Sequence, residues 1–521
     1  MKILGFQTGH DVSYAILENG IPIIHEELER FTRQKEPLGD GLKMAIDRLE
    51  TIDDINYFCM GNYGMYQPAG IRKWTSRGCY FIECVDQMNK VIKNNNGKFY
   101  EIGHHRSHAA NAFFSSNFDN ALIITMDGGG AEEDMTISAF TVWNGNKNKI
   151  YPIEIIPDRE LNLGVLWLNY TTKVFGLSGT GGPKGSQAGT VMGMAALGNP
   201  NKFKDNWQNI SLMKNYALQS EQNQFDIAAS LQQYTENIIY KKIKHYLTLH
   251  PNKNLCLSGG VALNCVMTGK IKKWFPELEN VYIDPVPYDG GLALGSARYV
   301  WHHVLNNPRI KWKDNSSPYL GMTYNQEDIE SCLNRNDIKY KKVTDDDVVQ
   351  LLNSQKIISV FNKGSESGRR ALGNRSIIAD PRSDKMKDMI NEKVKHRQWF
   401  RPFAPSILKE EVINWFEYDI NSPYMSFAIS FKKEMKDKVP AVVHFDGSAR
   451  LQTVTENDNK WYYNFIKKWF KVSGVPIVLN TSFNDREPIV ETPEHAINCF
   501  IGTDIDYLYF SDVQILVEKN K

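Results

Sequence analysis

A strand pattern that occurs twice constrains the fold of this 521-residue chain more than any other feature. Residues 1–30 contain three β-rich runs, separated by the Gly-containing turn QTGHD and by an Asn-Gly pair. Residues 121–156 repeat this order with the turn DGGGAEED and a second Asn-Gly pair. Because Asn-Gly between β-rich runs is a strong hairpin signal, each copy predicts a strand, a glycine turn, a strand, a hairpin and a strand.

The duplication favours an α/β fold of the actin/Hsp70 type, in which two such turns face each other across a nucleotide cleft. Two unrelated β-meanders in one α/β protein would give the same pattern, so this alternative stays open. Apolar residues at i, i+3 and i+4 spacing predict helices over residues 104–116 and 226–249. A third helix is predicted over 261–275, entered through Gly259 and Gly260.

The segment KWKDNSSP, residues 311–318, has the polar and Pro-terminated composition of a domain joint. We therefore predict two domains, residues 1–317 and 318–521. The elements predicted in the second domain are a helix over 345–355, strands over 356–361, 377–380 and 475–484, and a Gly/Ser/Arg-rich turn between the first two strands.

Charge and composition argue against several classes of function. With 61 Lys and Arg against 60 Asp and Glu, the net charge of +1 gives no global case for binding a nucleic-acid backbone, although a nucleotide substrate remains compatible. No run of about 18 apolar residues occurs, and the N-terminus lacks a signal-peptide pattern, so no membrane span is expected. None of the seven cysteines forms a CxxC pair, which disfavours zinc knuckles and predicts a reducing, cytoplasmic location.

Two histidines and two aspartates have the spacing and positions expected of metal ligands. His104 and His108 lie at i, i+4 in a predicted helix, which places both imidazoles on one face. Asp127 ends a predicted strand before a glycine turn, and Asp289 precedes a predicted helix N-terminus. Surface or capping roles would explain each residue alone. Together, imidazole nitrogens and carboxylate oxygens suit Fe(II), Mn(II) or Zn(II).

Two glycine turns are candidate phosphate sites. Gly128, Gly129 and Gly130 follow a predicted strand, and Gly259 and Gly260 lead into a predicted helix. Without side chains, such residues leave backbone N–H groups free to face anionic oxygens. Tight turns need glycine in any case, so the pattern by itself does not decide between the two roles.

Basic residues cluster on a Gly-rich segment of the C-terminal region. Arg369, Arg370 and Arg375 lie within seven residues, and Lys363 and Arg401 flank them. Arginines on such a loop can bind phosphate bidentately. A solvated basic face would have the same composition, so this alternative stays open.

A series of sequence blocks resembles the O-carbamoyltransferases that modify antibiotics and nodulation factors. The N-terminal blocks are G-x-x-x-x-H-D-x-S (5–13), EELERFTRQK (26–35), HHxxHA (104–109), MDGGG (126–130), VMGMAALG (191–198), SGGVALN (258–264) and DGGLALGSA (289–297). The C-terminal blocks are SESGRRALGNRSIIADPR (365–382), WFRPFAPSIL (399–408) and LNTSFN (479–484). They follow the order of the family, so the resemblance covers nearly the whole chain.

The resemblance implies an N-terminal domain similar to the transferase of the tRNA threonylcarbamoyl machinery and a C-terminal domain similar to YrdC. In this family the YrdC-like domain joins carbamoyl phosphate to ATP, which gives carbamoyl-AMP and pyrophosphate. The N-terminal domain binds the adenylate at an iron site and passes the carbamoyl group to a hydroxyl. Coupling to AMP supplies a good leaving group, and the metal acts as a Lewis acid.

The functional residues of the family map onto this sequence by motif. The implied ligands of Fe(II), or of another ion such as Mn(II) or Zn(II), are His104, His108, Asp127 and Asp289. The implied adenylate-binding residues are Gly128, Gly129, Gly130, Gly259, Gly260 and Asn264. His10 and Asp11 are the implied catalytic residues, with His10 as the base for the acceptor hydroxyl. The residues implied to bind carbamoyl phosphate and Mg-ATP are Lys363, Glu366, Arg370, Arg375, Arg401 and Asn480.

Three departures from the family pattern concern substrate contacts. Gly364 stands where the family commonly has Arg, and Arg369 stands where it commonly has Pro. Residues 188–190, Ala-Gly-Thr, replace a segment with Glu and Lys. The acceptor stays open among sugar, aminocyclitol, polyketide hydroxyl and hydroxymethylated nucleobase, and so does the oligomeric state, with a homodimer as one option.

Other classes compete with this interpretation. An actin-like-fold kinase explains the duplicated strands but neither HxxxH nor the last 200 or so residues. A maturation factor that carbamoylates a cysteine of a partner protein would carry CxxC pairs, which this sequence lacks. A pure Hsp70-like binding module would not need the metal quartet.

Overall fold

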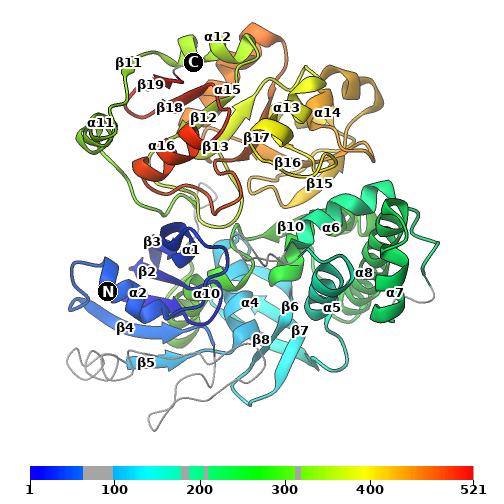
Figure 1. The fold of residues 1–521 in the computed structure, drawn as a ribbon. Coiled ribbons are helices and arrows are strands. Elements are labelled where there is room, and N and C mark those ends of the chain that lie inside the picture. Colours follow the sequence, from blue (N-terminus) through cyan, green and yellow to red (C-terminus); the bar gives the residue numbers. More distant parts are fainter. Residues whose placement is uncertain (63–97, 178–186, 205–208, 311–317, 520–521) are drawn as a thin grey trace. The chain divides into compact units, whose positions relative to one another are not determined.

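The computed structural model describes residues 1–62, 98–177, 187–204, 209–310 and 318–519, and these divide into two compact units (Figure 1). Unit 1 comprises Met1–Ser186, Thr235–Leu263 and Ile271–Ser316, and unit 2 comprises Gln187–Tyr234, Asn264–Lys270 and Ser317–Lys521. The last passage between units lies next to the predicted boundary. However, residues 187–234 and 264–270, which were predicted in the first domain, belong to unit 2. Residues 311–317 of the predicted linker lie outside the described residues.

Unit 1 contains two five-stranded sheets of identical topology. Their strand orders are β3-β2-β1-β4-β5 and β8-β7-β6-β9-β10, with the first three strands of each antiparallel and the others parallel. The predicted duplication is therefore confirmed. The strands are β1 Lys2–Gln7, β2 Ser13–Glu18, β3 Ile21–Glu27, β4 Ile55–Met60, β5 Lys98–Glu101, β6 Asn120–Ala131, β7 Ile137–Asn146, β8 Lys149–Pro157, β9 Asn254–Ser258 and β10 Asn280–Ile283.

The two predicted hairpins differ in outcome. Asn19 and Gly20 both have positive φ and form the turn between β2 and β3, as predicted. In the second copy the turn lies three residues beyond the Asn144-Gly145 pair, at Lys147 and Asn148, and Gly145 pairs with Ile150 inside the ladder. A Cβ at Gly145 would lie 2.7 Å from the ring of Phe113, so this glycine serves packing rather than the turn.

Helices of unit 1 pack closely on the sheets because glycines remove side chains at the contacts. Gly5 of β1 lies against the carbonyl of Ala293, and Gly295 lies against the carbonyl of Ser107; a Cβ at either glycine would come within 2.0 Å of that oxygen. These contacts bring α10 onto β1 and onto α4. Helices wholly in unit 1 are α1 Leu28–Thr32, α2 Gly41–Arg48, α4 His104–Ser115, α5 Leu163–Asn169 and α10 Leu292–Tyr299, with π-helical turns at Tyr170–Val174 and Val300–Val304 and a 3₁₀ turn at Asp289–Gly291.

Two predicted helices cross from one unit to the other along the chain. The helix predicted over 226–249 is α8, Glu221–Leu249. The helix predicted over 261–275 is interrupted: a 3₁₀ turn at Gly260–Leu263 precedes α9, Cys265–Trp274. The side chain of Asn264 lies between them and accepts a hydrogen bond from the N–H of Met267 (3.1 Å), so it caps α9.

Unit 2 is built on a nine-stranded mixed sheet of order β11-β19-β18-β12-β13-β17-β14-β16-β15. Its core packs α12 and α15 on one another over strand residues such as Ile358, Val360 and Val478. The strands are β11 Tyr340–Lys342, β12 Ile358–Phe361, β13 Arg375–Ala379, β14 Ala404–Leu408, β15 Phe427–Ser430, β16 Ser448–Val454, β17 Ile477–Ser482, β18 Tyr507–Phe510 and β19 Ile515–Glu518. The helices are α6 Ala188–Met194, α7 Ile210–Ala217, α11 Gln326–Arg335, α12 Asp345–Asn353, α13 Lys385–Lys393, α14 Val412–Trp415, α15 Lys460–Ser473 and α16 Pro493–Gly502, and the 3₁₀ turns are Ala195–Leu197, Lys409–Glu411, Lys433–Lys438 and Pro440–Val442.

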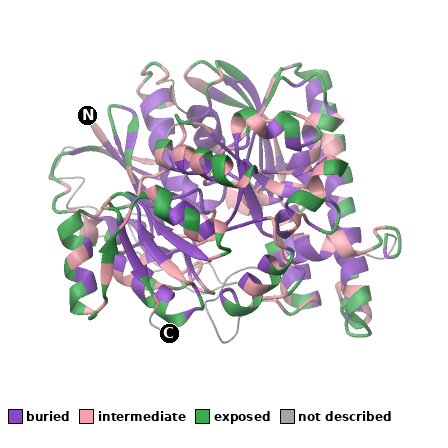
Figure 2. Ribbon diagram, turned by 90° about the horizontal axis from the view of Figure 1, so that it is seen from above, coloured by how far each residue is buried: buried purple, intermediate pink, exposed green. Residues whose placement is uncertain are grey.

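The elements predicted for the C-terminal region are present at their predicted places, and each unit has a mixed α/β fold. Figure 2 shows the sheet strands as largely buried, whereas helices alternate between buried and exposed residues. No helix among the described residues is long and apolar enough to cross a membrane.

Candidate metal and substrate sites

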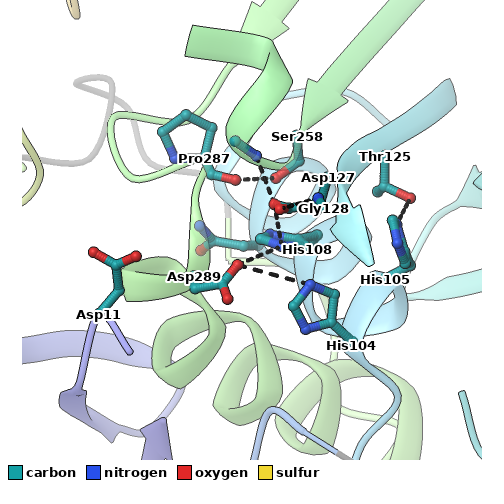
Figure 3. Close-up of polar contacts among 12 residues, drawn as sticks. Asp11, His104, His105, His108, Thr125, Asp127, Gly128, Ser258, Pro287 and Asp289 are labelled. Atoms are coloured by element: carbon teal, nitrogen blue, oxygen red, sulfur yellow. Dashed lines mark hydrogen bonds and ion pairs between the residues drawn. The ribbon is translucent and has the colours of Figure 1, made fainter. Parts of the chain in front are cut away.

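The four predicted metal ligands converge at one point of unit 1 (Figure 3). One ligand atom from each of His104, His108, Asp127 and Asp289 lies within 4.8 Å of all the others. The Nε2 atom of His108 lies 3.2 Å from a carboxylate oxygen of Asp127 and 3.4 Å from one of Asp289. The Nε2 atom of His104 lies 3.7 Å from the same oxygen of Asp289.

Local structure aims each ligand at this point. His104 and His108 lie four residues apart on successive turns of α4, so their side chains are on the same face of the helix. Asp127 lies in β6 at a bulge between Met126 and Gly130, and such an irregularity re-aims a side chain out of the ladder. Asp289 begins the 3₁₀ turn that leads into α10. The close contact between α10 and α4 therefore brings Asp289 to the histidines.

The cluster satisfies a chemical test for a metal site. The Nε2 atoms of both His104 and His108 are buried and have no hydrogen-bond partner among the described residues. The Nδ1 atom of His104 is 3.0 Å from the side-chain oxygen of Asn62, a contact that leaves Nε2 as the coordinating nitrogen. Donors about 2.0–2.2 Å from one ion lie no more than about 4.4 Å apart, so a slight contraction of this cluster would place all four on one metal.

The electrostatics of the cluster favour the ionised form of Asp127, which faces the imidazoles of His104 and His108. Burial raises the pKa of Asp127, but His108, His104 and the N–H of Gly260 outweigh it and hold the pKa well below the usual range. Burial lowers the pKa of His108, but the neighbouring carboxylates of Asp127 and Asp289 outweigh it and raise the pKa to about 9. Burial dominates at His104 and lowers its pKa. The carboxylate of Asp127 thus carries negative charge of the kind that a cation requires.

His105, between the two ligands, has a structural role. Its Nδ1 atom is 2.9 Å from the hydroxyl of Thr125, and its Nε2 atom is 2.9 Å from the carbonyl of Ser138. Both nitrogens are therefore engaged with the sheet. The N–H of His105 donates to the buried carboxylate of Glu132 (2.7 Å), which supports the N-terminus of α4.

The predicted glycine turns contact the candidate ligand Asp127 through their backbone. The backbone N–H groups of Gly128 and Gly260 donate to the two carboxylate oxygens of Asp127, at 2.5 and 2.6 Å. Gly259 has φ +87°, and a Cβ there would lie 2.0 Å from the carbonyl oxygen of Met126. These glycines therefore orient Asp127, and their predicted contact with an adenylate stays a prediction.

Gly130 and Gly128 provide a matched pair for testing this packing. A Cβ at Gly130 would lie 2.1 Å from the His104 ring, whereas a Cβ at Gly128 would meet nothing within 4 Å. We expect Gly130→Ala to displace His104, to lower unfolding free energy by about 1–3 kcal/mol and to weaken metal binding at least about tenfold. Gly128→Ala should leave both quantities nearly unchanged. Thermal melting and metal titration measure them, and equal metal affinity in the two variants would contradict the packing argument.

Residues that sequence reasoning missed also hold the site. Asn62 follows β4 and orients His104. Gly164, at the start of α5, lies against the backbone of Asp127, and a Cβ there would come within 2.5 Å of it. The side chain of Asn162 caps α5 through the N–H of Val165 (2.8 Å) and donates to the carbonyl of Gly128 (3.0 Å). The sequence does contain Gly61-Asn62 after a strand and Asn162 two residues before Gly164, which are turn and cap signals.

The turn of the first copy also reaches the cluster. His10 lies 3.4 Å from a carboxylate oxygen of Asp289 and 3.1 Å from one of Asp11, and its side chain is half exposed. Burial lowers its pKa, but Asp289 and Asp11 outweigh this effect and raise it to about 10. A protonated imidazole donates rather than accepts a proton, so a base role requires a cation that offsets these charges.

Comparison with known proteins decides the family. Family models described as carbamoyltransferase N-terminus and carbamoyltransferase C-terminus match residues 201–298 and 349–519. The nodulation protein NolO of Bradyrhizobium diazoefficiens is 32% identical over 78% of this chain and 77% of its own length. The chain belongs to the carbamoyltransferase family.

One further sequence relative and one solved structure are also similar to this chain. An uncharacterized protein of Synechocystis is 31% identical to this carbamoyltransferase over 96% of the chain and 94% of its own length. Among solved structures, HypF of T. kodakarensis covers 58% of this chain and 48% of its own, with 13% identity and a TM-score of 0.38. A structural likeness this distant carries no argument about fold or activity.

Several residues predicted to bind substrate in the C-terminal region have structural roles in unit 2. Arg375 is fully buried, and its guanidinium donates to the carbonyls of Asn362, Lys363, Asn374 and Glu491 at 2.7–3.3 Å. The two terminal nitrogens of Arg375 therefore hold the loop, and its predicted contact with phosphate stays a prediction. The carboxylate of Glu366 accepts from the N–H groups of residues 372, 374 and 375, so it shapes the same loop.

Other predicted residues keep groups available for a ligand. Asn480 is buried and donates to the carbonyl of Ala371 (3.1 Å), but its Oδ1 has no partner among the described residues. Lys363 is exposed and has φ +35°. Gly364 lies where a Cβ would be 2.7 Å from the carbonyl oxygen of Gly321, which explains why this chain lacks the arginine common at that position.

A cluster of arginines that sequence reasoning only partly identified lies in unit 2. Arg401 was predicted, whereas Arg397 and Arg450 were not. Burial and mutual repulsion lower the pKa of Arg397, and they lower that of Arg401 to about 10; burial lowers the pKa of Arg450. Among the described residues, no carboxylate forms an ion pair with any of these arginines. Arg370 and Arg450 both act electrostatically on the thiol of Cys265, which places each of them near this cysteine.

Proposed function

We propose that this carbamoyltransferase forms carbamoyl-AMP from carbamoyl phosphate and ATP and transfers the carbamoyl group to a hydroxyl of a small molecule. The observation that carries the proposal is the convergence of His104, His108, Asp127 and Asp289 in a chain of this family. The duplicated sheets of unit 1 support an actin-like transfer domain, and the family resemblance supports a YrdC-like role for unit 2.

Unit 2 offers the groups that adenylate formation needs. Arg397, Arg401 and Arg450 are recessed cations without carboxylate partners in the described part of the chain, which is the arrangement that binds phosphates. The unpartnered Oδ1 of Asn480 can accept a hydrogen bond from a carbamoyl NH₂ group. The atoms balance in two steps. Carbamoyl phosphate and water give carbamate and orthophosphate, and carbamate and ATP then give carbamoyl-AMP and pyrophosphate.

Unit 1 offers the groups that transfer needs. The acceptor oxygen attacks the carbamoyl carbon, the bond from that carbon to the phosphate oxygen breaks, and AMP leaves. His10 is the half-exposed member of the cluster, so it is the group that an acceptor hydroxyl can reach from solvent and to which its proton would pass. A bound Fe(II), Mn(II) or Zn(II) would supply Lewis-acid polarisation at an oxygen of the adenylate.

Product analysis tests the proposed activation step. The wild-type chain should release pyrophosphate only when ATP and carbamoyl phosphate are both present, because ATP loses pyrophosphate only as the adenylate forms. Omitting each substrate in turn is the control. Release of ADP instead of pyrophosphate would favour a kinase and contradict the proposal.

The acceptor is identified by mass spectrometry of hydroxyl compounds incubated with the chain, ATP, carbamoyl phosphate and Fe(II). Sugars, aminocyclitols, polyketides and hydroxymethylated nucleosides form the panel. A gain of one carbamoyl group on a hydroxyl is the expected result. Modification of a cysteine in a protein substrate, with none of the small molecules modified, would instead favour a maturation factor.

A further inference from the structure

Two large aromatic side chains of unit 2 are exposed next to the arginine cluster. Trp399 is 50% exposed and Phe445 is 48% exposed. Their rings meet edge to face, with 5.3 Å between centroids and an interplanar angle of 80°, and we call this pair the aromatic corner. Exposed aromatic pairs of this size are unfavourable in water and commonly mark a binding site.

The aromatic corner is connected to the arginines by the chain and by direct contacts. Trp399 lies between Arg397 and Arg401 in sequence, and Asn391 fixes the segment. Its side chain accepts from Arg397 (2.7 Å) and donates to the carbonyls of Trp399 (3.5 Å) and Arg401 (3.2 Å). Because Asn391 is buried, the segment presents the indole and the guanidinium groups in a fixed arrangement.

Lys387 connects Phe445 to the same cations. Its ammonium lies 4.2 Å from the centroid of the Phe445 ring. Burial lowers the pKa of Lys387, attraction to Asp388 opposes this effect, and repulsion from Arg397 adds to it, so Lys387 lies within electrostatic range of Arg397. An aromatic corner bordered by positive charge is complementary to a planar ring that carries a polyanion, and it is a poor match for a neutral or cationic partner.

We propose that Trp399 and Phe445 bind the purine ring of ATP while Arg397, Arg401 and Arg450 bind its phosphates. This inference rests on the proposed adenylate-forming function and adds the position of the nucleobase to it. Stacking on an aromatic face tolerates different bases, so the subsite predicts weak discrimination between ATP and GTP. Carbamoyl phosphate has no ring, and its binding should not depend on either aromatic residue.

The experiment separates the base from the phosphates. Calorimetry measures binding of ATP and of inorganic tripolyphosphate to the full chain, its Trp399→Ala and Phe445→Ala variants, and Tyr151→Ala. Tyr151 is an exposed aromatic of unit 1 and serves as the matched control. We expect Trp399→Ala to weaken ATP binding about tenfold or more and to leave tripolyphosphate binding within about twofold. Trp399→Phe should restore most of the ATP affinity, because it keeps an aromatic face.

Pyrophosphate release gives a second readout. In Trp399→Ala the KM for ATP should rise at least about tenfold while the KM for carbamoyl phosphate stays unchanged. Unchanged ATP affinity and KM in this variant, or equal losses for ATP and tripolyphosphate, would overturn the inference while leaving the proposed function intact. A wild-type chain that releases no pyrophosphate would instead end the proposed function and this inference with it.

Discussion

Replacing His108 by Gln or Asp127 by Asn is expected to lower carbamoyl transfer more than about 100-fold while pyrophosphate release stays within about twofold. Removing a residue that merely supports a metal ligand costs about 10- to 100-fold, so removing a ligand should cost more. All four ligands belong to unit 1, whereas the candidate phosphate-binding arginines belong to unit 2. The first reaction should therefore continue when the second is blocked.

Both substitutions preserve shape. Asn at position 127 can still accept a hydrogen bond from the N–H of Gly128 or Gly260, which keeps the bulge in place. His250→Ala is the control, because His250 is exposed at the end of α8. Arg370→Ala is the reciprocal variant and should lose both pyrophosphate release and transfer. If the His108 and Asp127 variants stay folded but lose pyrophosphate release, the division of labour between the units is wrong.

Much of the fold was predictable because its local signals agree with its global topology. The strands of both copies have β-rich composition and glycine turns, and the structure pairs them in two matching sheets. The hairpin at Asn19 and Gly20 was predicted, but the one at Asn144-Gly145 was misplaced. There the absent side chain of Gly145 makes room for Phe113, which lies about 30 residues away, and a local turn signal cannot reveal such a contact.

The division into units differs from the predicted domains in two segments. Chain continuity suggested one boundary near residue 317, whereas segments 187–234 and 264–270 belong to the second unit. Helices α8 and α9 each begin in unit 2 and end in unit 1. Their amphipathic patterns therefore continue through the point where the chain passes from one unit to the other. Periodicity shows that a helix buries a face but does not show which core covers it.

Site residues were predictable where spacing or position carries chemistry. The i, i+4 histidines and the aspartate at a strand end converge as predicted. Composition did not distinguish Arg375, which binds backbone carbonyls, from Arg401, which has no carboxylate partner in the described residues. The same donors serve either role, and only burial and the positions of acceptors separate them.

Metal removal is expected to abolish transfer without unfolding the chain. The buried Nε2 atoms of His104 and His108 and the carboxylates of Asp127 and Asp289 form a mixed nitrogen and oxygen donor set, which suits Fe(II), Mn(II) or Zn(II). The fold should survive because each unit has an apolar core cluster that contains none of the four ligands, and ion pairs of 3.2 and 3.4 Å hold the site together without an ion.

Elemental analysis of the purified chain, followed by melting curves and transfer assays before and after chelation, measures this expectation. Loss of a bound ion should lower the melting temperature by less than about 10 °C, because ligand binding at moderate saturation contributes only a few kcal/mol. Re-addition of the ion that elemental analysis identifies should restore transfer. His108→Gln is the matched control, since a chain without a complete donor set should show no melting shift on chelation. Transfer that continues in a chain shown to be metal-free would rule out a catalytic ion at these four residues.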